Sequence, residues 1–279
     1  MQALTQLLVL VFVVSTMLGV GLMLTVRDIS ASLHDRPWLV RALLANLVAL
    51  PALALGISRL LGLDAMLTAA LLVLATTPGG PVVVKLATLA KGDPALAVGL
   101  VVSLMLIGVV TQPLVLPLLL EDVAVSTGAI LRTLLFTVLT PLLFGFALRA
   151  RRASLAQRLQ LPLQRLSTLS MILVVALLPA MHWRELLELS SSDAFPASLL
   201  FVAFGAAAGW LIGGPRTGPR RILTLCCSQP NMAAAMVIAN QNFNDPRVVL
   251  MLLLVMIASV LILLPLTLHF ARRPLAAHT

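Results

Sequence analysis

The chain has 279 residues, of which 60% are apolar and 10% charged, and its formal net charge is +9. Soluble proteins carry roughly 25% charged residues, so this composition excludes a globule that faces water on all sides. The basic residues are scattered over short loops without a basic face, which argues against a nucleic-acid partner. We therefore expect one transmembrane domain over residues 1–279, with the lipid bilayer as its surroundings.

Taken in chain order, the apolar residues form blocks long enough to cross a hydrocarbon core about 30 Å thick. They predict an all-α polytopic membrane protein with about nine transmembrane helices. The first block has no basic residue before it and no small-residue cleavage pattern after it, which favours a retained helix over a signal peptide. The expected spans are 4–26, 38–58, 64–90, 94–120, 126–148, 163–181, 195–213, 220–242 and 247–270.

The distribution of Lys and Arg predicts the orientation in the membrane. With the N-terminus outside, fourteen basic residues lie on the cytoplasmic side and four lie near the outer surface. Cytoplasmic loops carry the excess of positive charge in membrane proteins. We expect a multi-pass protein of the cell (plasma or inner) membrane, with its N-terminus outside and its C-terminus in the cytoplasm.

Two of the spans are interrupted. The third contains the segment 76–81 (TTPGGP), and the eighth contains the segment 228–231 (SQPN). Proline lacks a backbone donor and glycine favours non-helical angles, so neither segment continues a helix. The halves on either side are too short to cross alone. The sequence predicts two discontinuous helices, whose second halves begin near Val82 and Met232.

An internal duplication relates the two halves of the chain. A single offset of 152 residues superimposes three proline positions, each at a matching place in its span. A shift by five spans inverts the second copy, which is typical of inverted-repeat secondary transporters. We expect repeat 1 at about 4–120 and repeat 2 at about 126–270, the second with one extra helix. The matching pairs are Pro78 and Pro230, Asp93-Pro94 and Asp245-Pro246, and Pro113 and Pro265.

The interruptions predict a substrate site between the repeats. Non-helical backbone is tolerated in a membrane only where protein or a water-filled cavity satisfies it. The amino ends of the second half-helices favour an anion there. Alternatively, the breaks are proline kinks whose polar residues only satisfy the backbone. The candidate residues at the breaks and on the adjacent second span are Asn46, Thr76, Thr77, Gly79, Gly80, Ser228, Gln229 and Asn231.

Two motifs carry a resemblance to a known family. Pro78-Gly79-Gly80 followed by residues 91–97 (KGDPALA), and residues 228–235 (SQPNMAAA), resemble the crossover motifs of the bile acid:sodium symporter family. The resemblance continues in order over nearly the whole chain. It implies a core sub-domain in which the broken spans, within 64–120 and 220–270, cross each other, and a panel sub-domain beside it. It also implies alternating access for organic anions, often with sodium.

The sodium part of this resemblance fits poorly. Members that bind sodium usually have small polar residues after Pro-Gly-Gly and a Glu one turn before the second motif's Gln, whereas this chain has Val83, Val84 and Leu225. Neutral oxygens at the breaks could form only a weak sodium site without a carboxylate. A metal ligand set is therefore left open, and no cofactor is expected beyond sodium or a proton as coupling ion.

Lys85 is a charged residue inside the third span. An ionised lysine at a helix centre costs roughly 2.5 to 3.5 kcal/mol on insertion scales. Its side chain either reaches toward the membrane surface, or its ammonium replaces the missing cation or meets the substrate and exchanges a proton. The second reading makes Lys85 a candidate site residue.

These observations favour a secondary active transporter of a small organic anion with proton-linked coupling. A sodium-coupled symporter with a weak neutral-ligand site is the alternative, and a passive channel or pore is the alternative from another class. An enzyme is not expected, because the spans lack an acid pair or a histidine cluster. Substrate identity, transport direction and oligomeric state do not follow from the sequence.

Overall fold

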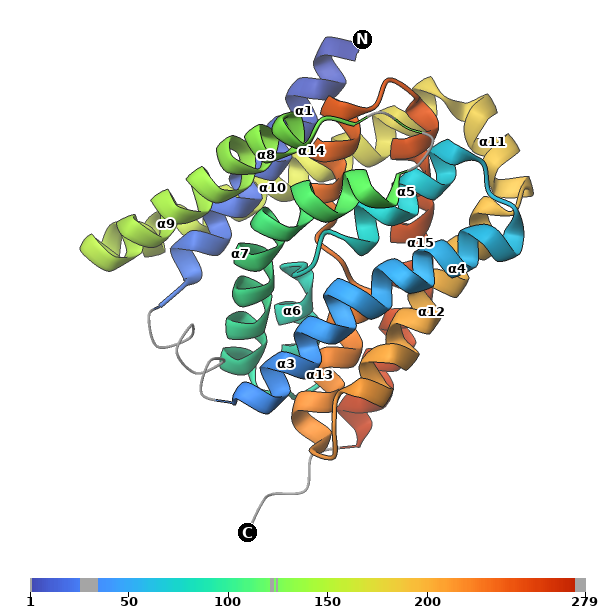
Figure 1. The fold of residues 1–279 in the computed structure, drawn as a ribbon. Coiled ribbons are helices and arrows are strands. Elements are labelled where there is room, and N and C mark those ends of the chain that lie inside the picture. Colours follow the sequence, from blue (N-terminus) through green and yellow to red (C-terminus); the bar gives the residue numbers. More distant parts are fainter. Residues whose placement is uncertain (1, 26–34, 121–122, 124, 274–279) are drawn as a thin grey trace.

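The computed structural model of the chain describes residues 2–25, 35–120, 123 and 125–273, and Figure 1 shows its fold. Helices are the only regular secondary structure assigned within these ranges, which confirms the all-α prediction. The elements are α1 (Gln2–Met23), α3 (Arg36–Leu44), η1 (Ala45–Ala49), α4 (Leu50–Leu61), α5 (Ala65–Ala75), α6 (Val82–Leu89), α7 (Pro94–Leu119), α8 (Thr127–Leu134), η2 (Leu135–Leu139), α9 (Thr140–Arg151), α10 (Ala153–Met181), α11 (Trp183–Ser191), α12 (Ala194–Ile212), α13 (Thr217–Ser228), α14 (Met232–Asn242) and α15 (Pro246–Arg272).

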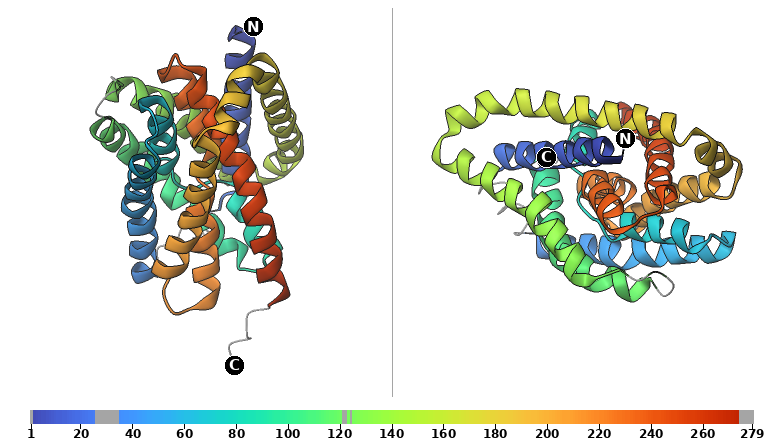
Figure 2. Two further views of the ribbon diagram at one scale, coloured as in Figure 1. Left: turned by 90° about the vertical axis from the view of Figure 1, so that its right-hand side faces the viewer. Right: turned by 90° about the horizontal axis from the view of Figure 1, so that it is seen from above.

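Eight helices in the described ranges are long and apolar enough to cross a membrane, which confirms a polytopic protein. The apolar α5 has only 11 residues, and α6 has eight, so neither spans alone. The count of about nine spans, which treats α5 and α6 as one, stays a prediction. Figures 1 and 2 show the start of α1 and the end of α15 at opposite ends of the molecule.

Helix boundaries differ from the sequence expectation in two places. The 29-residue α10 begins at Ala153, ten residues before the expected start of the sixth span. The added part carries Arg and Gln, which lower hydropathy but form helices well. The short α11 was not expected, because its nine residues are too few and too polar for a span. Residue 26, the expected end of the first span, lies outside the described residues.

Both predicted interruptions are present. Helix α5 ends at Ala75 and α6 begins at Val82, while α13 ends at Ser228 and α14 begins at Met232. Gly79 has a φ of 83°, a conformation that glycine adopts without steric cost. The side chain of Asn231 accepts a hydrogen bond from the N–H of Ala234 and so caps α14.

Two other spans contain π-helical turns. η1 joins α3 to α4, and η2 joins α8 to α9; Pro51 and Pro141 follow them closely. Proline has no backbone N–H, so the carbonyl one turn before it loses its helical partner and the local helix widens. Because of η1, Asn46 lies in a π-helical turn directed toward α13, where its amide contacts Cys227.

The helices pack in two groups. Helix α1 packs against α9 and α10, while α12 packs against α4, α13 and α15, and both groups can be followed in Figure 2. Glycines allow close approach: a Cβ at Gly205 on α12 would lie 2.6 Å from the carbonyl oxygen of Cys227 on α13. The division into core and panel, and the inverted repeats, stay predictions.

Candidate functional site

The two interrupted spans cross in direct contact. The backbone N–H of Asn231 donates to the carbonyl oxygen of Thr77 at 2.9 Å. A Cβ at Gly80 would lie 2.5 Å from the carbonyl oxygen of Gln229. The backbone freed by each break is thus partly satisfied by the other break.

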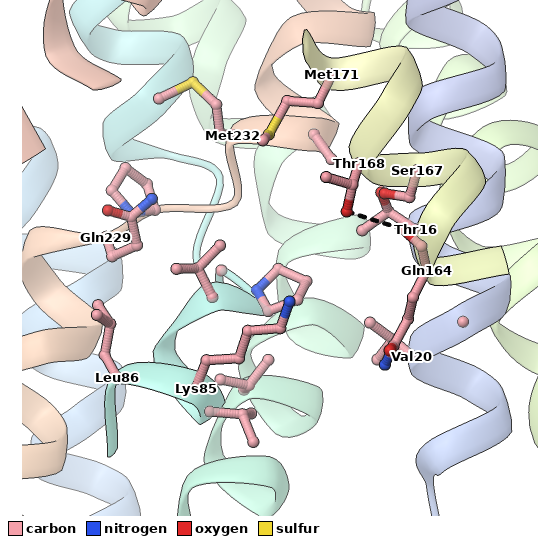
Figure 3. Close-up of a pocket in the computed structure, with 18 of the residues that line it drawn as sticks. Thr16, Val20, Lys85, Leu86, Gln164, Ser167, Thr168, Met171, Gln229 and Met232 are labelled. Carbon is pink, nitrogen blue, oxygen red and sulfur yellow. Dashed lines mark hydrogen bonds between the residues drawn. The ribbon is translucent and has the colours of Figure 1, made fainter. Parts of the chain in front are cut away.

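A cavity of about 450 Å³ lies beside this crossing and is shown in Figure 3. Helices α1 and α10 form one wall, and α6, α7, α14 and α15 with the α13–α14 break form the rest. Apolar side chains predominate, which is usual for small-molecule sites. Five of the lining residues are methionines, whose flexible side chains adapt to differently shaped ligands: Met23, Met171, Met232, Met236 and Met256.

Three of the predicted site residues line this cavity: Gly80, Lys85 and Gln229. Figure 3 shows the side chain of Lys85 directed from α6 into the cavity. Within the described residues, no hydrogen bond or ion pair engages the Lys85 ammonium, and no other charged residue lines the cavity. The ammonium is therefore available to a ligand.

Thr76 and Thr77 are buried behind the crossing and do not line the cavity. The side-chain Nε2 of Gln112 on α7 donates to the hydroxyl of Thr77 at 2.6 Å and to that of Thr76 at 3.3 Å. It also donates to the carbonyl oxygen of Val73 at 3.3 Å. These bonds hold the end of α5 against α7, and a ligand-binding role for Thr76 and Thr77 stays a prediction. Sequence analysis missed Gln112 because a single amide in a long apolar helix gives no distinct signal.

Four further predicted residues are also buried away from the cavity. The Nδ2 of Asn46 donates to the carbonyl oxygen of Ala42 at 2.8 Å and contacts the Sγ of Cys227 at 3.6 Å. The Ser228 hydroxyl donates to its own helix at 2.8 Å. Gly79 packs against α7, and Asn231 caps α14. These contacts fix the shape of the breaks, and a ligand-binding role for these four residues stays a prediction.

The polar wall on α1 and α10 was missed. The hydroxyls of Thr16 and Ser167 are 2.6 Å apart, which joins the two helices within the cavity wall. The signal was present: the offset of 152 that relates the proline positions also places Ser15-Thr16 on Ser167-Thr168. Hydroxyl residues are common in transmembrane helices, so this match between the two Ser-Thr pairs was not informative by itself. It becomes informative because the structure places all four residues in the wall of one cavity.

The positions that correspond to polar residues in sodium-binding members of the resembling family are apolar in this chain. Val83 and Leu225 are completely buried, and Val84 belongs to the cavity wall. Over the part of the chain that the structure describes, no group of three or more His, Cys, Asp or Glu could hold a metal ion.

Charged residues join the ends of α5 and α15 that lie away from the cavity. Asp64 and Asp245 cap these helices, and Arg247 pairs with them at 2.9 Å and 2.7 Å. Partial burial raises the pKa of the Asp245 carboxyl, but the hydrogen bonds from Arg247 outweigh it, so the net pKa is lowered. The carboxylate therefore stays ionised at neutral pH and fixes the start of α15.

Two broken helices that cross beside a cavity define a class of helical membrane proteins to which many secondary transporters belong. Residues 8–190 match the Sodium Bile acid symporter family, and the chain belongs to that family. The match includes the first broken span and α10, whereas the second broken span lies beyond it.

Relatives of this chain include an uncharacterized sodium-dependent transporter, YocS, of Bacillus subtilis, 30% identical over 141 residues, or 50% of this chain and 44% of the relative. The probable sodium/metabolite cotransporter BASS1 of Arabidopsis thaliana chloroplasts is 24% identical over 235 residues, 83% of this chain and 58% of the relative. The probable sodium/metabolite cotransporter BASS2 of Oryza sativa subsp. japonica chloroplasts is 25% identical over 240 residues, 83% of this chain and 56% of the relative. The chain spans about half the length of these relatives.

Proposed function

We propose that the chain is a secondary active transporter that moves a small organic anion across the cell membrane by alternating access, with Lys85 meeting the negative charge. The observation that carries this proposal is the Lys85 side chain, directed into the cavity without a carboxylate among the described residues around it. Lys85 is an exposed residue in the absence of a ligand, and a bound anion would pair its ammonium with an opposite charge.

The beginnings of α6 and α14 support an anion as the ligand. Pro81 and Val82 at the start of α6, and Met232 at the start of α14, all line the cavity. The amino end of a helix carries partial positive charge from its backbone N–H groups. The two helix amino ends and the Lys85 ammonium therefore all contribute positive electrostatic potential to the same cavity.

Coupling to a proton fits this cavity better than coupling to sodium. Lys85 is the one charged group among the described lining residues, and none of them is a carboxylate that could ligate sodium. The hydroxyls of Thr76 and Thr77 accept from Gln112 and donate to their own helix, which leaves them poorly placed for a cation. Sodium coupling remains the alternative, and relatives described as sodium-dependent transporters or sodium/metabolite cotransporters favour it.

The test is uptake of an anion into proteoliposomes by Lys85→Met and Lys85→Arg variants. Loss of one charged contact is worth about 1.5 to 3 kcal/mol, so Lys85→Met should weaken half-saturation by roughly ten- to a hundredfold. Lys85→Arg should retain affinity but lose the dependence of uptake on pH, because its guanidinium stays charged. Lys91→Met, which removes a charge outside the cavity, is the matched control.

Unchanged affinity and unchanged pH dependence in both Lys85 variants would overturn the proposal. Uptake driven by a sodium gradient at fixed pH, and absent when choline replaces sodium, would establish the alternative. Conductance without saturation would point to a passive pore.

A further inference from the structure

The cavity has a second polar feature opposite Lys85, made of two Ser-Thr pairs. Ser15 and Thr16 lie on α1, Ser167 and Thr168 lie on α10, and all four line the cavity. The offset of 152 residues relates one pair to the other. Figure 3 shows Thr16, Ser167 and Thr168 across the cavity from Lys85. We call these four residues the hydroxyl platform.

The hydroxyl platform presents acceptor oxygens to the cavity. Ser15 donates its hydroxyl proton to the carbonyl oxygen of Val11 at 2.6 Å, and Thr168 donates to that of Gln164 at 2.8 Å. Thr16 and Ser167 share a hydrogen bond with each other. A hydroxyl that has given its proton away still has lone pairs, so the platform suits a ligand that brings its own donor.

A neighbouring side chain also lacks a partner. Ser259 on α15 lines the same cavity and is 3% exposed, and its buried hydroxyl has no hydrogen-bond partner within the described residues. A buried hydroxyl without a partner is unfavourable by about 1 to 3 kcal/mol. Because the hydroxyl oxygen itself is buried, Ser259 adds a polar group behind the cavity wall and no contact to the ligand.

The charge of the cavity limits the charge of its ligand. Lys85 alone among the described lining residues is charged, so it neutralises one negative group. A second negative group would lie among Val, Met, hydroxyl groups and the Gln164 amide, without a cation in the described wall to compensate it. Burying an unpaired charge is strongly unfavourable.

We propose that the cavity selects monoanions that carry a hydroxyl or N–H donor at the end remote from the charge. The anionic group lies at Lys85 and Gln229, and the donor lies on the hydroxyl platform. This inference rests on the proposed function, and it makes the ligand a bridge between α6, next to the crossing, and the α1–α10 wall. A ligand with both ends satisfied contacts α6 and the α1–α10 wall at once.

The experiment uses four six-carbon probes with the purified full chain in proteoliposomes. They are hexane-1-sulfonate, 6-hydroxyhexane-1-sulfonate, hexane-1,6-disulfonate and uncharged hexane-1,6-diol. Sulfonates stay ionised and do not leak through the bilayer as neutral acids. We expect half-saturation about two- to tenfold tighter for the hydroxysulfonate than for hexanesulfonate, since one neutral hydrogen bond is gained. The disulfonate and the diol should bind more weakly than either monoanion.

Variants of the hydroxyl platform locate the effect. Thr168→Val should bring the ratio of hydroxysulfonate to hexanesulfonate affinity close to one, and Thr168→Ser should restore it. Thr111→Val is the matched control, because Thr111 donates to its own helix on α7 and does not line the cavity. It should keep the ratio of the unaltered protein.

The outcomes separate the two proposals. Saturable uptake of both monosulfonates with equal affinity, or of the disulfonate in preference to them, overturns the inference and leaves the anion transporter standing. A ratio that Thr168→Val does not change also overturns it. Absence of saturable uptake for all four probes counts against both proposals.

Discussion

Gly80 determines how closely the two interrupted spans approach each other. A methyl group at this position would meet the carbonyl oxygens of Gln229 and Pro230 at 2.5 and 2.6 Å. Neither neighbour is a flexible side chain that could turn away, since both are backbone atoms at the second break. The absence of a side chain at Gly80 is therefore a condition of the crossing, and through it of the cavity.

Gly80→Ala should destabilise the protein by about 1 to 3 kcal/mol, the usual cost of inserting a methyl group into a packed site. Gly56→Ala is the matched control: Gly56 lies exposed in α4 with nothing within 4 Å of a built Cβ. That control should be neutral or slightly stabilising, because alanine favours a helix. Thermal unfolding in detergent measures both, and equal melting temperatures for the two variants would contradict this account.

Among the elements, α8 and α14 are joined on the side of the crossing away from the cavity. The hydroxyl of Thr133 on α8 donates to the Oε1 of Gln241 near the end of α14 at 2.9 Å. The cavity lies on the other side, toward Met23 at the end of α1. A contact that closes one side while a cavity forms on the other is what alternating access requires of one of its two states.

Thr133→Val should favour opening on the α8–α14 side, since it removes one hydrogen bond between these helices. A cysteine at Val138, which is buried on η2 in a small hollow that Leu134 of α8 and Ala234 of α14 also line, reports this opening by its rate of alkylation. We expect a rise of about two- to tenfold when Thr133→Val is added to Val138→Cys.

Thr140→Val serves as the control, because the Thr140 hydroxyl bonds only to its own span. An alkylation rate that Thr133→Val leaves unchanged, or raises no more than Thr140→Val does, would show that the α8–α14 contact does not restrain this side.

For the whole molecule, the orientation in the membrane is open to a direct test. Ser154 and Ser190 are exposed at the two ends of the pair of helices α10 and α11. With the N-terminus outside, Ser190→Cys should react with an impermeant maleimide on intact cells, and Ser154→Cys only after lysis. The native Cys226 and Cys227 are buried and give little background. The reverse pattern of labelling would invert the proposed orientation.

The local chemistry of the chain made several features predictable. Proline and glycine interrupt a helix at their own positions. Residues 76–81 and 228–231 therefore predicted both interruptions and the starts of α6 and α14. Lys85 was recognisable from the sequence as a charged residue within an apolar span. The family also followed from motifs at the breaks, and its match over residues 8–190 confirms it.

The sequence by itself determined that this is an all-α membrane protein with two broken spans, because composition and helix breakers are properties of short segments. Only the tertiary structure decided which polar groups face the cavity. Thr76 and Thr77 turn toward Gln112, whereas Ser15 and Thr16 line the cavity. That difference depends on how helices distant in the chain are rotated against each other, which the packing of the whole bundle sets and no local pattern encodes.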